Sequence, residues 1–471
     1  MLNRLKLIGL PCLLLLCCTL PHLNQGDFRR DTVRYAAVGL QMWTEGPPGV
    51  MRLNPETPYF NKPPLAIAIH GLFLKLFGVH LAVARVPSIL AALGVVILSV
   101  LTVRLIASRA EAVVSGLVLA TTYEFFRRTR EISLDFWQLF FVMLAVYVVV
   151  KALKQNRPGG LALALAGVPL GLALLCKPLV ALAVLPILAG WAWLAGRRQA
   201  AVWLLTATLA VALLVALPWH LYMWSLYGPA FAQQYFGHEV LSRAQGNLKS
   251  NPFHYYFANL LKTYWPWLLA VAWAVRQRWF RLGQPQRRRF RDLTWLGGFW
   301  VACVLLMLSF FPDKKVNYPL PVYPMLSWVA AAGLCRVPWQ KLRDWYARGF
   351  AGLAPATASL LVLLSVLPLR VAEPPSENWQ ALFDWLRAEH IPPASLRHHE
   401  VKPELLCYYY LQTGVFPQRF EPGASESAVT NRLILIEPEG DSARAAAAPV
   451  LFAAGKLAIV SSTNWVAPMR Q

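Results

Sequence analysis

The feature that most constrains this fold is a series of apolar runs that recurs from residue 5 to residue 369. Each run is close to the length of about 17–25 residues that an α-helix needs to cross the hydrocarbon core of a bilayer. The runs lie at residues 5–23, 86–107, 110–126, 134–150, 161–176, 179–195, 201–222, 256–275, 294–311, 318–335 and 350–369. Hydrophobic residues make up 57% of the chain and charged residues only 14%, which is not the composition of a water-soluble globular protein. The sequence therefore predicts an all-α polytopic membrane protein with about 11–13 transmembrane helices.

Basic residues gather in short clusters between these runs and give a formal net charge of +22. In a soluble protein this charge would suggest nucleic acid, but basic clusters between apolar spans are typical of cytoplasmic loops. The clusters lie at Arg104 and Arg109, from Lys151 to Arg157, at Arg197 and Arg198, from Arg276 to Arg291 and from Arg336 to Arg348. We therefore predict a cytoplasmic N-terminus and no nucleic-acid partner. Residues 1–23 could be a signal peptide, although the spans that follow favour an uncleaved signal anchor.

One short run, Leu65 to Gly78, carries His70 and Lys75, and we interpret it as a juxtamembrane helix on the outer face. The polar regions on that face are then residues 24–64, 127–135, 223–255 and 312–317, together with the tail after residue 372. The tail contains β-like runs at 433–437 and 457–461 and a helix-like stretch at 379–389. We predict a transmembrane domain at 1–371, with its first outer loop at 24–64, and a small extracytoplasmic α/β domain at 372–471.

Two carboxylates, Asp31 and Asp135, each lie at the mouth of a predicted span. A carboxylate partly withdrawn from water near cations can act as a general base, a substrate-orienting group or a metal ligand. Structural alternatives remain open for both: Asp31 could cap the amphipathic stretch 32–43, and Asp135 could simply pair with Arg130.

Positive charge on the outer face runs against the orientation rule and invites an explanation. It is found in the stretch Arg127-Arg128-Thr129-Arg130, in the pair Lys314-Lys315 and at the isolated residues Lys62, Lys177 and Arg243. Arg and Lys donors suit a phosphate or pyrophosphate held at the membrane surface. The alternative is that these side chains reach out to lipid headgroups.

The order of several short motifs along the chain resembles that of a known family. The motifs are Asp31-Thr32-Val33-Arg34-Tyr35-Ala36, Tyr59-Phe60-Asn61-Lys62-Pro63-Pro64-Leu65, Ala84-Arg85-Val86-Pro87-Ser88, Arg130-Glu131-Ile132-Ser133-Leu134-Asp135, Leu175-Cys176-Lys177-Pro178 and Lys314-Lys315-Val316-Asn317-Tyr318-Pro319-Leu320-Pro321. Together they resemble the bacterial aminoarabinose lipid A transferase and its relatives, which are polyprenyl-phosphate-sugar-dependent glycosyltransferases of the GT-C fold. Protein O-mannosyltransferases are more distant kin. The resemblance covers about residues 1–335, and the tail resembles no family that we can name.

This resemblance implies transfer of a sugar from undecaprenyl phosphate to an extracytoplasmic acceptor, such as lipid A, another envelope glycan or lipid, or a protein. It also implies a bacterial inner-membrane location with the active site facing the periplasm. Asp31 and Asp135 match the aspartates of the first and second outer loops, and we predict that both are catalytic. The residues predicted to bind the lipid phosphate or the donor are Tyr35, Tyr59, Lys62, Arg130, Arg243, Lys314, Lys315 and Tyr318.

The chain departs from the family pattern at positions implicated in metal binding. Thr32 and Asn61 stand where the family usually has Glu, and residues 238–240 read His-Glu-Val where the family has Glu-His before its arginine. His238 and Glu239 could contact a metal, although adjacent residues seldom face one ion. We therefore assign no metal ligand and no certain cofactor, and a divalent metal stays an open alternative.

Two rival functions come from other protein classes. A lipid or glycan transporter or flippase would show charges at the bilayer midplane and paired broken helices in repeated halves, whereas the basic residues here lie at the ends of spans. A non-catalytic subunit of a glycan-assembly complex would not need Asp31. The sequence favours a membrane glycosyltransferase, either a hexosyl- or a pentosyltransferase.

Overall fold

The computed structural model describes most of the chain. Its described residues are 2–25, 28, 30–45, 47, 49–154, 159–242, 251–280, 287–312, 314–337, 379–398, 401–419, 433–436, 450–454 and 457–461. The predicted span at 350–369 and the candidate phosphate ligand Arg243 lie outside these residues.

The described chain forms two compact units. Unit 1 comprises Met1–Leu23, Phe60–Ala66 and Arg85–Pro368, and unit 2 comprises Asn24–Tyr59, Ile67–Ala84 and Leu369–Gln471. The first outer loop therefore belongs to the same unit as the C-terminal tail, while its last residues, from Phe60 onward, belong to the helical unit.

All regular secondary structure in the described part of unit 1 is helical. Its elements are α1 Leu2–Thr19, η1 Leu20–His22, α4 Leu81–Ile106, α5 Arg109–Ala120, α6 Tyr123–Arg128, α7 Leu134–Leu153, α8 Gly160–Ala164, α9 Gly167–Leu174, α10 Pro178–Leu194, α11 Arg198–Trp203, η2 Leu204–Thr208, α12 Leu209–Ala232, η3 Gln233–Ser242, α14 Tyr255–Thr263, α15 Trp265–Phe280, α16 Arg287–Phe310, η4 Leu320–Val322 and α17 Tyr323–Leu334. Each predicted apolar run from 5–23 to 318–335 coincides with one or more of these helices. Some runs are divided, as where α5 ends at Ala120 and α6 begins at Tyr123.

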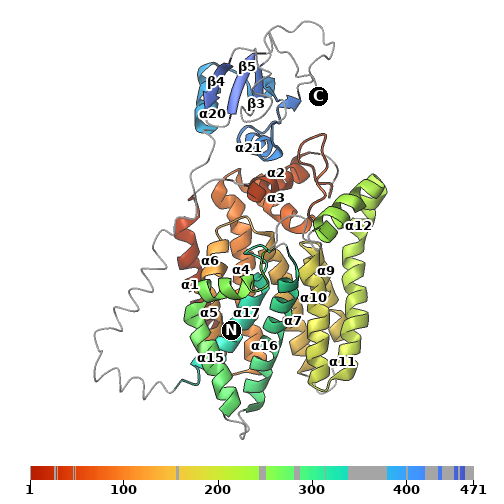
Figure 1. Cartoon of the computed structure of the whole chain (residues 1–471), viewed down its shortest axis with the longest axis vertical. Helices are drawn as coiled ribbons and strands as arrows, with labels where there is room; N and C mark the ends of the chain where they lie inside the picture. Colours follow the sequence, from red (N-terminus) through yellow and green to blue (C-terminus); the bar gives the residue numbers. More distant parts are fainter. Residues whose placement is uncertain are drawn as a thin grey trace, which may run out of the picture. The chain divides into compact units, whose positions relative to one another are not determined.

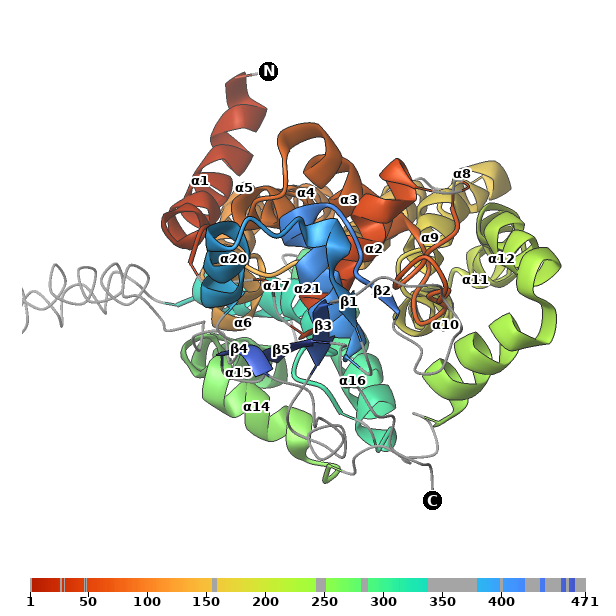
Figure 2. The same ribbon diagram turned by 90° about the horizontal axis from the view of Figure 1, so that it is seen from above.

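The long helices of unit 1 run in roughly the same direction (Figure 1). Helix α9 packs against α7 and α12, while α17 packs against α5, α15 and α16. In Figure 2, α9 and α12 lie on the opposite side of the helical unit from α5 and α15. Helices α15 and α17 approach closely at Gly333, where an added Cβ would lie 2.1 Å from the carbonyl oxygen of Ala270. Trp300 and Trp328 are fully buried, and the indole of Trp328 donates to Ser99 Oγ at 2.7 Å.

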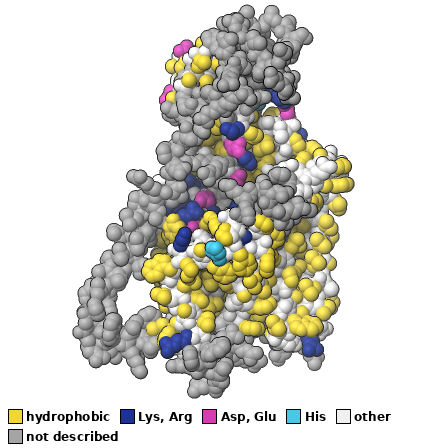
Figure 3. All heavy atoms as spheres, in the orientation of Figure 1, with side chains coloured by type: hydrophobic (Ala, Val, Ile, Leu, Met, Phe, Trp, Pro, Cys, Tyr) yellow, Lys and Arg dark blue, Asp and Glu magenta, His cyan; other side chains and the backbone are white. Residues whose placement is uncertain are grey.

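The outside of unit 1 is apolar. Leu214, Leu221, Leu261 and Leu269 are more than half exposed, and hydrophobic side chains dominate the helical face shown in Figure 3. Within the described residues, four helical stretches are long and apolar enough to span a membrane. They are Leu81–Ile106, Leu134–Leu153, Arg198–Gly237 and Leu293–Phe310. Because exposed leucine on this scale is unfavourable in water, unit 1 is suited to a lipid surrounding.

Unit 2 begins with α2, Arg30–Thr44, and includes most of α3, Leu65–Phe77. The two helices meet at a pair of glycines: a Cβ added to Gly71 would lie 1.9 Å from the carbonyl oxygen of Gly39. Only residues without a side chain allow this close backbone approach. The short run after the double proline is thus a helix packed on α2, and its position in the membrane stays a prediction.

The tail part of unit 2 is a small α/β structure. Its elements are α20 Trp379–Ala388, η5 Pro393–Ser395, β1 Arg397–His398, α21 Pro403–Thr413, β2 Gln418–Arg419, β3 Leu433–Ile436, β4 Val450–Ala454 and β5 Leu457–Ser461. The sheet order is β2-β1-β3-β5-β4, with β1 parallel to β2 and β3, and with β5 antiparallel to β3 and β4. The predicted helix and both predicted strands coincide with α20, β3 and β5.

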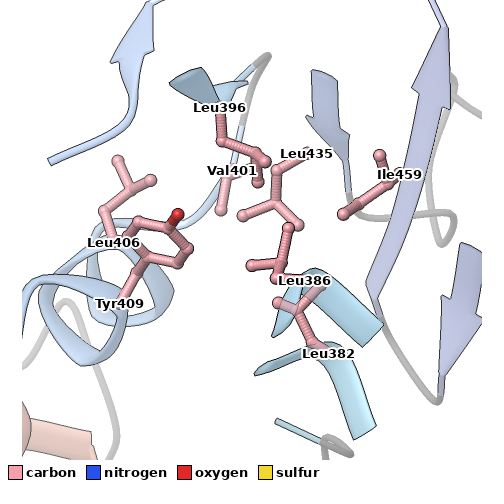
Figure 4. Packing of buried hydrophobic residues seen from close by; sticks show 8 residues of the cluster. All are labelled: Leu382, Leu386, Leu396, Val401, Leu406, Tyr409, Leu435 and Ile459. Carbon is pink, nitrogen blue, oxygen red and sulfur yellow. The ribbon is translucent and has the colours of Figure 1, made fainter. Parts of the chain in front are cut away.

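Both helices of the tail pack on this sheet (Figure 4). Leu382 and Leu386 come from α20, Leu406 and Tyr409 from α21, and the sheet contributes Leu435 and Ile459. All of these side chains are almost completely buried. The core therefore fixes one face of α21 and leaves its other face available for a second contact.

Candidate active site

Asp135 lies in the first turn of α7, where unit 1 holds a connected set of polar side chains. Ser133, just before the helix, is extended, and its backbone N–H donates to Ser88 Oγ at 2.9 Å. A carboxylate in a first helical turn is also favoured by the helix dipole. The start of α7 thus places Asp135 at the end of an apolar span, as the sequence predicts.

Both oxygens of the Asp135 carboxylate accept hydrogen bonds. Lys177 Nζ lies 2.6 Å from Oδ1, and Asn317 Nδ2 donates to Oδ2 at 2.6 Å. The ammonium of Lys177 also lies 4.7 Å from the centre of the Tyr318 ring. The side chains of Asp135 and Lys177 are only 16% and 20% exposed, so the pair is partly withdrawn from solvent. Gln138, one turn along α7, donates to the backbone carbonyl of Lys177 and holds this segment in place.

The structural alternative that Asp135 pairs with Arg130 is wrong. Arg130 is 1% exposed and donates through Nη2 to the carbonyl of Cys18 in α1. Its Nε and Nη1 atoms have no hydrogen-bond partner among the described residues. The turn after α6 directs this guanidinium toward α1, and no described contact joins it to Asp135. Its assignment to the phosphate site stays a prediction.

The neighbouring arginines are neutralised locally. Arg127 and Arg128 both contact the buried carboxylate of Glu124, at 3.0 and 3.1 Å, and both contact Glu131, at 3.0 and 3.4 Å. These residues lie three or four positions apart, which is the spacing of neighbours on a helical surface. Two carboxylates thus balance two of the three arginines that make the sequence stretch so basic.

The Lys62 segment is held beside the Lys177 segment. The backbone N–H of Leu65 donates to the carbonyl of Leu175 at 3.0 Å, two residues before Lys177. Lys62 Nζ donates to the carbonyl of Asn61 at 2.9 Å. Two of the predicted outer-face cations therefore lie on chain segments that are hydrogen-bonded to each other.

The other side of this segment contacts the end of α12 and η3. Asn61 Oδ1 accepts from Gln234 Nε2 at 3.0 Å, and the Phe60 ring packs edge-on against Tyr227 and Phe231. Residues 60–65 of the predicted loop motif thus contact both the segment before α10 and the end of α12 with η3.

Lys314 and Lys315 differ in their surroundings. Lys314 is buried and donates from Nζ to the carbonyl of Asn251 at 2.9 Å, and burial lowers the pKa of its ammonium below the usual value. Asn251 in turn donates from Nδ2 to the Lys314 carbonyl at 3.3 Å. Lys315 is exposed. Of the pair, Lys315 is the one whose charge faces solvent.

Unit 2 contains the remaining predicted residues of the first loop. Asp31 is the second residue of α2 and not the residue before the helix, so the alternative that it is the N-cap is wrong. Its side chain is 54% exposed. Arg34 lies one turn further on, with Nη1 3.7 Å from Asp31 Oδ1. Tyr35 is half-buried in the same helix, and Tyr59 is buried, with its N–H donating to the Met51 carbonyl at 2.8 Å.

Sequence reasoning missed three members of the Asp135 cluster. The motifs point to no role for Asn317 or Gln138 and mark Lys177 only as an isolated cation, whereas the structure brings all three to Asp135 or its partner. The one available signal was position, because Asn317 lies directly between the lysine pair and Tyr318.

The described residues do not form a good set of ligands for a divalent metal at the position that the resemblance indicates. Asn61 has an amide there in place of a carboxylate, and its oxygen already accepts from Gln234. Among the described residues, no group of three or more His, Cys, Asp or Glu side chains gathers in a way that could hold an ion. The side chains of His238 and Glu239 lie outside the described part of the chain. We therefore derive no step through a metal.

Comparison with known proteins confirms the resemblance seen in the motifs. Residues 61–224 match the model of the dolichyl-phosphate-mannose-protein mannosyltransferase family. The chain is 26% identical over 385 residues to an undecaprenyl phosphate-α-4-amino-4-deoxy-L-arabinose arabinosyl transferase of Pseudomonas fluorescens, covering 78% of this chain and 66% of the relative. A second such transferase, from Sodalis glossinidius, is 28% identical over 347 residues, covering 69% of this chain and 58% of the relative. The chain thus spans somewhat less than two thirds of the length of these relatives.

Solved structures define the class of fold. The crystal structure of ArnT from Cupriavidus metallidurans bound to undecaprenyl phosphate superposes with a TM-score of 0.69 at 18% identity, over 95% of this chain and 96% of that one. The archaeal oligosaccharyltransferase AglB from Archaeoglobus fulgidus gives a TM-score of 0.54 at 14% identity, over 91% of this chain and 61% of that one. The predicted fold class, a helical polytopic membrane protein with a small C-terminal α/β region, is confirmed. The particular fold is that of ArnT.

Proposed function

We propose that this chain is an integral-membrane glycosyltransferase that moves a sugar from a polyprenyl phosphate donor to an acceptor outside the cytoplasm. The observation that carries the proposal is the Asp135–Lys177–Asn317–Tyr318 cluster, joined by a backbone hydrogen bond to the segment of Lys62. Two relatives support the proposal. One is an arabinosyl transferase named for an undecaprenyl phosphate sugar, and the other is the ArnT structure, which contains undecaprenyl phosphate. The similarity to bacterial transferases supports a location in the inner membrane, and the charge distribution of the loops supports an orientation in which the site faces the periplasm.

The two lysines supply the electrostatic part of the proposed reaction. The bond between the anomeric carbon and the phosphate oxygen breaks, and negative charge builds on the departing lipid phosphate. Lys62 and Lys177 offset this charge, together with Arg243, because preorganised cations in a partly water-excluded site stabilise charge that develops in the transition state. Asp135 accepts a hydrogen bond from Lys177 on one oxygen and from Asn317 on the other, and in this proposal its role in catalysis is to position Lys177 beside the phosphate.

Asp31 acts on the acceptor in the proposed reaction. Its carboxylate is half exposed and therefore accessible to an acceptor. It accepts the proton of an acceptor hydroxyl as the acceptor oxygen forms a bond to the anomeric carbon. Lipid A, another envelope glycan or lipid, and an envelope protein all offer such hydroxyls.

The proposal is tested by mass spectrometry of lipid A, glycans and envelope proteins from cells with and without this chain. We expect one of these fractions to lose a single sugar when the chain is removed, and to regain it on complementation. Unchanged glycans in all three fractions, with polyprenyl-phosphate-sugar accumulating on one membrane face, would indicate the transporter instead.

Lys62→Ala is expected to raise the KM for the lipid donor about tenfold or more, since a charge-assisted phosphate contact contributes about 1.5–3 kcal/mol. Turnover at varied donor concentration in nanodiscs measures this effect. Lys154→Ala is the matched control, because Lys154 is an exposed lysine remote from the cluster in sequence and structure. An unchanged donor KM in Lys62→Ala would remove Lys62 from the donor site.

A further inference from the structure

Helix α21 of the C-terminal tail lies against α2 of the first outer loop within unit 2. Leu406 and Tyr409 point from α21 into the core of the tail (Figure 4). Glu404, Cys407 and Tyr410 follow one another at intervals of three residues, which places them along a different stripe of the helix. This second stripe provides the contacts with the loop.

Four polar contacts from three residues join the second stripe to the loop. Glu404 Oε1 pairs with Nη2 of Arg34, and the hydroxyl of Tyr410 donates to Glu45 Oε1 at 2.8 Å and lies 3.2 Å from Thr44 Oγ1. Cys407 Sγ lies 3.6 Å from the carbonyl oxygen of Leu53. The Tyr410 contacts hold the C-terminal end of α2, whereas the Glu404 contact reaches its first turns, next to Asp31.

Arg34 is held between two carboxylates. One guanidinium nitrogen pairs with Glu404, and the other lies 3.7 Å from Asp31 Oδ1, beyond hydrogen-bond distance. The Arg34 and Glu404 side chains are only 26% and 30% exposed, while Asp31 is 54% exposed. Arg34 thus makes its hydrogen bond to Glu404 and only a long, 3.7 Å ion pair to Asp31, whose side chain stays 54% exposed.

We propose that Glu404 is a positioning residue through which the tail controls the first-loop carboxylate: by pairing with Arg34, it prevents Arg34 from closing a full ion pair with Asp31. Without Glu404, the planar guanidinium turns to Asp31 and binds both of its oxygens, a geometry that arginine and carboxylate favour. Asp31 is then no longer available to an acceptor. This inference rests on the proposed function, in which Asp31 receives the acceptor proton.

The test compares three variants of the full chain in nanodiscs. Glu404→Gln keeps the shape and removes the charge; we expect kcat to fall about tenfold or more, as misplacement of a reacting group does, with the donor KM unchanged. Glu404→Asp keeps the charge and should recover most of the turnover. Tyr410→Phe removes the other α21–α2 hydrogen bonds without touching Arg34, and its turnover should stay within about twofold of the original chain.

Hydrogen exchange of residues 30–44 is measured on the same samples. We expect Glu404→Gln to change exchange at the first turns of α2, and Tyr410→Phe to change it at the last turn. Full turnover in Glu404→Gln, or an equal loss in Tyr410→Phe, would overturn the proposal. If the original chain itself transfers no sugar, the proposed function fails. Exchange in Glu404→Gln that matches the original chain would then also overturn the positioning contact.

Discussion

Lys177→Met is expected to lower sugar transfer at least about 100-fold, the typical loss when one preorganised donor to developing negative charge is removed. It should also destabilise the helical unit, because the partly buried carboxylate of Asp135 loses its cation and keeps only Asn317. Breaking a buried ion pair from one side costs about 3–5 kcal/mol. Turnover in nanodiscs and thermal unfolding in detergent measure the two effects separately.

The double variant Lys177→Met with Asp135→Asn separates the stabilising role of this pair from its role in transfer. It removes both charges, so the uncompensated carboxylate disappears and we expect most of the thermal stability to return. Transfer should stay as low as in the single variant, because the cation for the phosphate is still missing. A double variant that regained transfer would show that the Asp135–Lys177 pair supports only the packing of α7 against the segment before α10.

Asp31→Asn is expected to reduce transfer to a hydroxyl acceptor by about 10²–10⁴-fold, the contribution typical of a positioned general base. Because Asp31 is 54% exposed, the isosteric amide should leave folding and expression unchanged. The measurement is the transfer rate at saturating donor, with the amount of folded protein determined in parallel.

Asp384→Asn provides the matched control for Asp31→Asn. Asp384 is an aspartate of similar exposure, 57%, and it also has an arginine three residues later on its helix, Arg387. It lies on α20, which packs in the tail, and we expect full turnover from this variant. Full transfer by Asp31→Asn would overturn the assignment of Asp31 as the general base. If the chain transfers no sugar by itself but Asp31→Asn still complements cells that lack it, the non-catalytic subunit would be favoured.

The membrane helices could be predicted because their cause is local. A membrane span must satisfy its backbone hydrogen bonds internally and present apolar side chains to lipid. One continuous apolar run of sufficient length meets both requirements, so it can be recognised in the sequence. The positions at which a single apolar run breaks into two helices are harder to predict from the sequence. The run at 110–126 divides at Thr121 and Thr122, because the Thr122 backbone is extended (φ −69°, ψ 118°) and α6 begins only at Tyr123.

The candidate site could be predicted only in part. Asp31, Lys62 and Asp135 were recognisable from motif order, but the partners of each came from elsewhere in the chain. Lys177 lies 42 residues from Asp135, Asn317 lies 182 residues from it, and Glu404 lies 370 residues from Arg34. Contacts at these separations depend on helix packing, which a local pattern does not contain.

By itself, the sequence determined that this is a multi-pass helical membrane protein, and it marked Asp31, Asp135 and Lys62 for attention, because apolar runs and short polar motifs act over a few turns of chain. The tertiary structure decided which partner each charged side chain has. It neutralised Arg127 and Arg128 with two carboxylates, directed Arg130 toward α1 and joined Asp135 to Lys177. It also brought a glutamate of the tail onto the first loop. A charge acts on whatever the fold places within a few ångströms of it, and only the packing of distant segments sets that neighbour.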